Sequence, residues 1–179
     1  DDNEIYFTIE NNKKINLPQI GLDEASHNYP LDRQEINRLR ALNLSHHRTN
    51  LHLSDPDYKV KLIKLSKDAF KLNLKLETAL FLSKNAEVEL AEFLKLLGEI
   101  NPPIETFLIF HEEEISTSEK WILLSRKFLK KYNKNIKIGS GTNVFFTDLN
   151  RSGTSMETMD FVSYSINPQV HAFDNFSLV

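Results

Sequence analysis

The sequence predicts an α/β fold, an incomplete (β/α)8 barrel of the TIM type with about six of its strands present. Apolar β-type runs alternate with helical stretches, and these stretches carry apolar residues at 3.6-residue spacing. A complete barrel needs about 250 residues, whereas this chain has 179. Six strands could also form an open doubly wound sheet, but no glycine-rich phosphate-binding loop follows any of them.

The strands are predicted from short apolar runs rich in β-forming residues. The run at 76–82 is echoed by the run at 104–110, and the separation of about 28 residues matches one strand–helix unit. Two apolar strands can also resemble each other by chance. The six predicted strands are 20–22, 49–53, 76–82, 104–110, 136–138 and 161–166.

The helices are predicted from apolar residues at positions i, i+3, i+4 and i+7. Capping-box spacing, with a cap residue three positions before a glutamate, marks two starts, and an aspartate before a proline marks another. The cap signals are Asp32 with Glu35, Ser116 with Glu119, and Asp55 before Pro56. The apolar stripes are Leu62, Leu65, Ala69 and Leu72; Leu90, Phe93, Leu94 and Leu97; and Trp121, Leu124, Phe128, Leu129 and Tyr132.

Two parts of the chain are expected. Segments 5–9 and 15–17 predict a short hairpin, so residues 1–16 form an N-terminal β segment and residues 17–179 form the partial barrel. The last residues, 174–179, have the pattern of a helix start, so we expect the barrel to be cut at its carboxyl end. A first residue other than methionine indicates that a preceding segment has been removed.

The composition of the chain argues against two classes of binding partner. A net charge of −3 and a pI near 6.1 give no electrostatic reason to bind nucleic acid or an anionic membrane. The chain has no signal-peptide pattern and no run of about 18 apolar residues, so a cytoplasmic location is favoured while the compartment stays open. Cysteine is absent, which excludes disulfides, thiolate zinc sites and a cysteine nucleophile.

Polar residues gather where the predicted strands end, which is where a barrel builds its active site. Period-2 alternation places Arg48, Asn50 and His52 on one face of the second strand, with leucines on the other. An exposed edge strand with a wet face would show the same pattern. An inward-facing arginine requires an acidic partner. Asp23 and His27, after the first strand, would join this face at the rim of the barrel.

The fourth strand is followed by His111 and three glutamates, 112–114. A carboxylic acid beside a sugar can donate a proton to a leaving oxygen or take one from water. Neighbouring side chains on extended backbone point apart, so one of the three should face the pocket, and we expect Glu112. The run could instead be the solvated start of the next helix, an interpretation that we favour for Glu113 and Glu114.

The fifth and sixth units add a further set of polar side chains. Two glycines within 139–143 would permit close backbone approach to a ligand. Histidines at three strand ends raise a metal hypothesis, but no H-x-H or H-E-x-x-H spacing exists, so we predict neither a metal nor another cofactor. The candidate substrate-binding residues in these units are Asp148, Asn150, Tyr164, Asn167 and His171.

Three segments carry a family resemblance: LPQIGLDEAS at 17–26, FFTDLNRSG at 145–153 and DFVSYSINPQVHAFDNFSLV at 160–179. They resemble the D-apionate lactonase family of bacterial sugar-acid catabolism. The resemblance implies a hydrolase that opens the lactone of a branched sugar acid, with more of the barrel beyond Val179.

The layout is also similar to the clan of retaining glycoside hydrolase barrels, which carry an arginine on strand two and a glutamate ending strand four. Arg48 and Glu112 match those places. In that clan asparagine usually precedes the glutamate, whereas here His111 does, and the clan's nucleophile comes from a seventh strand that this chain lacks.

We therefore expect a carbohydrate-directed hydrolase, best described as a sugar-acid lactonase acting on a substrate such as D-apionolactone. Glu112 would serve as general acid/base and Arg48 would orient it or its carboxylate partner, while His52, His111, Asn167 and His171 bind substrate. The 179-residue chain by itself should be inactive, because the remainder of its own barrel is expected to be the partner that completes the active site. A retaining glycosidase and a non-catalytic carbohydrate-binding or scaffolding domain are the alternatives.

Overall fold

The computed structural model describes residues 8, 16–25, 29–152, 157–166 and 174. Within them, six parallel strands form one sheet whose order follows the chain, so the sheet is the wall of a barrel rather than a doubly wound sheet, in which the order reverses. The prediction of an incomplete barrel is confirmed. The strands are β1 (Gly21–Asp23), β2 (His46–His52), β3 (Lys75–Leu82), β4 (Ile104–His111), β5 (Lys137–Phe145) and β6 (Val162–Ser165).

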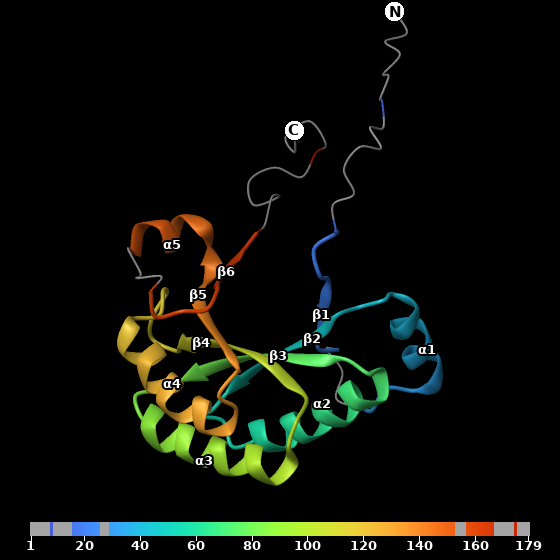
Figure 1. The fold of residues 1–179 in the computed structure, drawn as a ribbon, viewed down its shortest axis with the longest axis horizontal. Helices are drawn as coiled ribbons and strands as arrows, with labels where there is room; N and C mark the ends of the chain where they lie inside the picture. The colour runs from blue at the N-terminus through green and yellow to red at the C-terminus, as the bar shows by residue number, and fades with distance from the viewer. Residues whose placement is uncertain (1–7, 9–15, 26–28, 153–156, 167–173, 175–179) are drawn as a thin grey trace, which may run out of the picture.

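A helix connects each strand to the next. Figure 1 shows α2, α3 and α4 side by side along one face of the curved sheet, with α1 beside β1 and α5 at the far end of β5. The sheet therefore has a helix-covered outer face and a concave inner face, as in half of a barrel. The helices are α1 (Arg33–Ala41), α2 (Tyr58–Leu72), α3 (Ala86–Ile100), α4 (Glu119–Tyr132) and α5 (Phe146–Ser152).

The two faces of the sheet bury different sets of side chains. Leu51, Leu80 and Phe107 pack on the helix side in one large core cluster. Alternate residues on the same strands point inward, where Ala79, Leu108 and Phe110 form a smaller cluster with Phe81 and Phe161. His46, Arg48 and Asn50 of β2 are partly exposed and His52 is exposed, while the residues between them are buried, so the period-2 prediction for this strand is confirmed.

Two glycines of β5 allow a neighbouring segment of the chain to pack closely against this strand. A Cβ at Gly139 would lie 2.6 Å from the Phe161 ring, and one at Gly141, where φ is +151°, would lie 2.0 Å from the Ser163 carbonyl oxygen. The glycines were predicted to allow a ligand to approach the backbone, but it is Phe161 and Ser163 that approach it. The fifth strand was predicted at 136–138, but β5 extends to Phe145 and so includes residues 139–143.

The helix ends show a capping box at one start and asparagines in the left-handed conformation after three ends. The capping box at the start of α1 is present, with Asp32 and Glu35 exchanging hydrogen bonds of 2.8 Å. Asn43, Asn73 and Asn101 adopt left-handed backbone conformations after the first three helices, with φ of 50°, 57° and 42°. No helix among the described residues has the length and apolar character needed to cross a membrane.

The hairpin predicted before the barrel lies outside the described residues, apart from residues 8, 16 and 17.

Candidate active site

A cavity of about 480 Å³ opens where four consecutive strands end. The concave face of a barrel meets solvent at this edge, so side chains from distant parts of the sequence converge here. The cavity is lined by one residue from β2, one from β3, the last residue of β4 with the four that follow it, and two from β5. These are His52, Phe81, His111, Glu112, Glu113, Glu114, Ile115, Asn143 and Val144.

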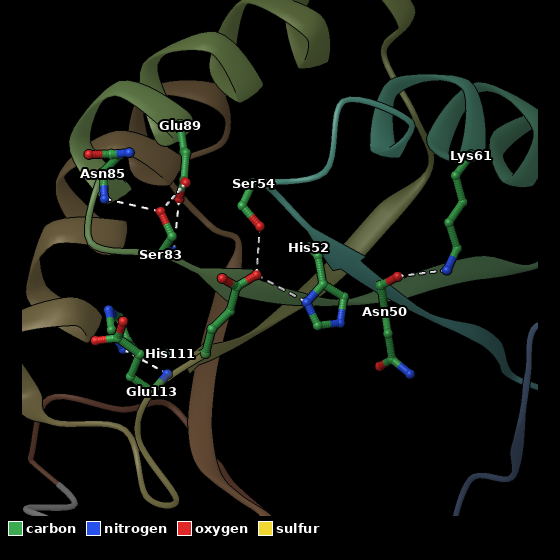
Figure 2. A network of polar contacts seen from close by, with 10 residues as sticks. Asn50, His52, Ser54, Lys61, Ser83, Asn85, Glu89, His111 and Glu113 are labelled. Carbon is green, nitrogen blue, oxygen red and sulfur yellow. Dashed lines mark hydrogen bonds and ion pairs between the residues drawn. The ribbon is translucent and has the colours of Figure 1, made fainter.

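Glu112 is the carboxylate on which the bonds from Ser54 and His52 meet, shown unlabelled between these two residues in Figure 2. It follows the last residue of β4, and its backbone N–H donates to the Leu82 carbonyl at 2.9 Å, which fixes the start of the turn. Its Oε1 accepts a hydrogen bond from Ser54 Oγ at 2.7 Å and lies 3.1 Å from His52 Nδ1. The network joins the end of β2 to the end of β4 across β3.

Aromatic stacking fixes the plane of the His52 ring. The ring lies 4.4 Å from that of Phe81 at an interplanar angle of 12°, and Phe81 in turn lies 5.1 Å from Phe110. The three rings form a stacked row because the strand register places His52 opposite Phe81 and Phe81 opposite Phe110. The His52 side chain stays 52% exposed, so the ring is oriented and still accessible.

The other two glutamates of the run behave differently. Glu114 accepts hydrogen bonds from the Ser118 N–H at 2.7 Å, the Ser118 hydroxyl at 3.0 Å and Trp121 Nε1 at 2.8 Å. Burial alone raises the pKa of its carboxyl, but these donors and the nearby His111 bring the pKa below its ordinary value. Glu114 therefore caps α4, while for Glu113 the contact is from its backbone N–H to His111 Nδ1 at 3.3 Å.

His111 turns toward the helices. Its ring is buried and stacks on Trp121 of α4, with centroids 4.4 Å apart and an angle of 11°. His111 has the same parity as Phe107 and Ile109, which pack on the helix side, so its ring and the Glu112 carboxylate leave the strand in different directions. Among the described residues, no three His, Asp or Glu side chains are grouped closely enough to hold a metal ion.

Arg48 has an acidic partner on the neighbouring strand. Its Nη1 lies 3.8 Å from Glu77 Oε1, and the two residues are directly opposite in the β2–β3 register. His52 lies four residue steps along β2 from Arg48, which at about 3.3 Å per step is roughly 13 Å. The structure thus pairs Arg48 with Glu77, deeper in the barrel, and does not join it to Glu112.

A second cavity, of about 640 Å³, lies on the other side of His52. Lys61 ties its walls together, pairing with Glu24 Oε1 at 2.6 Å and donating to the Asn50 carbonyl at 2.8 Å. The side-chain Oδ1 of Asn50 is buried without a hydrogen-bond partner in the described structure. His52 borders both cavities, so it stands at their junction.

The remaining predicted residues are dispersed. The Asp23 carboxylate accepts from the Glu24 N–H at 2.8 Å, at the end of β1. Asp148 and Asn150 lie on α5, and the Tyr164 ring packs 5.0 Å from Phe146; none of these three lines either cavity. His27, Asn167 and His171 lie outside the described residues.

Sequence reasoning did not single out Lys61, Glu77 or Phe81 as residues of these sites. Strand parity would have placed Glu77 and Phe81 on the concave face. Lys61 carries no such signal, because its partners depend on how α2 packs back on β2.

Comparison with protein families identifies the chain. Residues 20–179 match the family model described as D-apionate lactonase, TIM barrel domain. The chain belongs to the D-apionate lactonase family. Membership in this lactonase family supports a sugar-related hydrolase, and the resemblance predicted from the three sequence segments is confirmed. Comparisons with curated proteins and with solved structures give no significant match.

Proposed function

We propose that this barrel hydrolyses the lactone of a sugar acid such as D-apionolactone, at the cavity where β2 to β5 end. The observation that carries the proposal is the Glu112 carboxylate, held by Ser54 at 2.7 Å and by His52 at 3.1 Å on the rim of a 480 Å³ cavity. Hydrolysis of an ester-type bond requires a group that removes a proton from water and returns one to the leaving oxygen. The family name supports a lactone as the substrate class.

The cavity suits a small polyhydroxylated ring. Its size falls within the range of about 300–1,000 Å³ that is typical of small-molecule sites. Phe81 and Ile115 offer apolar contact surface, while Asn143 and Glu113 offer polar groups for hydroxyls. Arg48 and Glu77 are a charged pair on the concave face toward the amino ends of the strands.

We also propose that the rest of a barrel completes this site in the intact enzyme. Among the described strands, β1 pairs with β2 alone and β6 with β5 alone, so both are sheet edges. A barrel has no free edges, because its first and last strands are joined by hydrogen bonds. Residues 1–179 alone are therefore expected to lack activity.

The test is an assay of the full-length protein on D-apionolactone, other aldonolactones and aryl glycosides. We expect turnover of lactones, and a loss of about 100-fold or more in kcat for Glu112→Gln. Glu105→Gln, at the opposite end of the same strand, is the matched control and should keep full activity.

Two outcomes would replace the proposal. Activity confined to glycosides would favour a retaining glycosidase, which needs a second carboxylate about 5–5.5 Å from the first. Sugar binding without turnover, unchanged by Glu112→Gln, would favour a non-catalytic carbohydrate-binding domain.

A further inference from the structure

We propose that His52 is the group that moves protons in this reaction, and that Glu112 orients it; this inference rests on the proposed lactone hydrolysis. His52 Nδ1 lies 3.1 Å from Glu112 Oε1. A carboxylate at Nδ1 keeps the proton on that nitrogen, which leaves the lone pair on Nε2. Histidine is the side chain best suited to exchange protons near neutral pH.

The contacts of Glu112 favour this division of roles. The Ser54 hydroxyl donates to Oε1 at 2.7 Å, and the His52 Nδ1–H donates to the same oxygen. These two contacts hold Oε1 between the Ser54 hydroxyl and the His52 ring, which fixes the carboxylate against the imidazole. Glu112 is therefore a positioning residue, and Ser54 holds the carboxylate toward the imidazole.

The position of His52 gives Nε2 access to a ligand. The ring is stacked on Phe81 at 4.4 Å, so it cannot tilt freely, yet the side chain is 52% exposed. His52 borders the 480 Å³ and the 640 Å³ cavities, and no other residue that lines both is found among the described residues. Figure 2 shows Asn50 on the side of the ring opposite the bond to the carboxylate, where Nε2 lies. A lactone placed at this junction meets the free nitrogen.

The proposed steps balance as follows. Nε2 takes a proton from water while the water oxygen bonds to the lactone carbonyl carbon, and the carbonyl π electrons move to oxygen. The tetrahedral intermediate then re-forms the C=O bond as the ring C–O bond breaks. The departing ring oxygen takes the proton from the imidazolium, so water adds across the bond and His52 is regenerated with Glu112 still ionised.

The experiment compares His52→Ala and His52→Gln in the full-length enzyme with D-apionolactone as substrate. We expect kcat to fall about 10²–10⁴-fold in both variants while KM changes little, and added imidazole to restore part of kcat in His52→Ala. Imidazole should not help His52→Gln, which fills the space, or Glu112→Gln. His46→Gln, at the amino end of the same strand, is the control.

A second variant pair tests the positioning role of Ser54. Ser54→Ala should lower kcat about five- to tenfold, the effect of one hydrogen bond, and Ser54→Thr should restore most of it because the hydroxyl is kept. Circular dichroism and the thermal midpoint check that each variant is folded.

The outcomes separate this inference from the proposed function. A kcat for His52→Gln within about threefold of wild type would overturn the role of His52 while leaving lactone hydrolysis intact. A loss that imidazole leaves unchanged in His52→Ala would also overturn it, since a structural role does not respond to an added base. A wild-type enzyme inactive on every lactone would instead overturn the proposed function.

Discussion

Replacing Gly141 with alanine tests the close contact between β5 and β6. The backbone there has φ of +151°, and an added Cβ would lie 2.0 Å from the Ser163 carbonyl oxygen, far inside van der Waals contact. The conformation costs an alanine about 1–3 kcal/mol. The clash is with backbone, so it is relieved only if the strands separate at the Gly141–Ser163 pair, at a further cost of about one hydrogen bond, roughly 1 kcal/mol. We expect a total loss of about 2–4 kcal/mol.

Gly98 is the matched control for this prediction. It lies exposed in α3, and a Cβ there would meet nothing within 4 Å. Gly98→Ala should stabilise the protein by about 0.5–1 kcal/mol through helix propensity. Urea denaturation of the full-length protein measures both changes. A Gly141→Ala variant as stable as wild type would refute the packing of β6 on β5 that brings Phe161 over the concave face.

Two further predictions concern stability. Burial raises the pKa of the Asp160 carboxyl, but bonds from Arg126 at 3.1 and 3.2 Å and from the Ile138 N–H at 2.7 Å bring it below its ordinary value. Asp160→Asn should therefore cost about 1–2 kcal/mol near neutral pH, and the difference from wild type, followed by denaturation against pH, should disappear as pH falls below the ordinary carboxyl range of about 4. Asn73→Ala should cost about 1 kcal/mol because of its left-handed backbone, whereas Asn73→Gly should be nearly neutral in the same assay.

The fold could be predicted because each strand and helix carries its own local signal. Residues 79–82 and 107–110 are continuous apolar runs, which is typical of strands buried on both faces of a parallel sheet. The fifth strand was predicted too short, because glycine, serine and asparagine in 139–143 are typical of loops. The two glycines are in the strand because the Phe161 ring at Gly139 and the Ser163 backbone at Gly141 leave no room for a side chain.

The start of α4 shows where local signals mislead. Capping-box spacing predicted Ser116 as the cap, but Ser116 pairs with Thr142 of β5 in an isolated bridge, and the helix begins after Ser118. The carboxylate that accepts from the backbone N–H of Ser118 belongs to Glu114, which precedes Ser116 in the sequence. The helix position was correct, and its cap was decided by contacts with a strand distant in the sequence.

The site was harder to predict than the fold because it depends on register. Period-2 alternation gives the face on which His52 lies but not which residue of β4 lies near it. His52 is level with Phe81, and Phe81 with Phe110, so Glu112, two residues beyond Phe110, is placed past the strand end, where its side chain turns back to His52 Nδ1. A slip of one residue in the pairing of β3 with β4 would turn the His111 side chain to the concave face. The contact between Glu112 and His52 would then be lost. The stacked row of His52, Phe81 and Phe110 thus connects the register of the sheet to the geometry of the proposed catalytic pair.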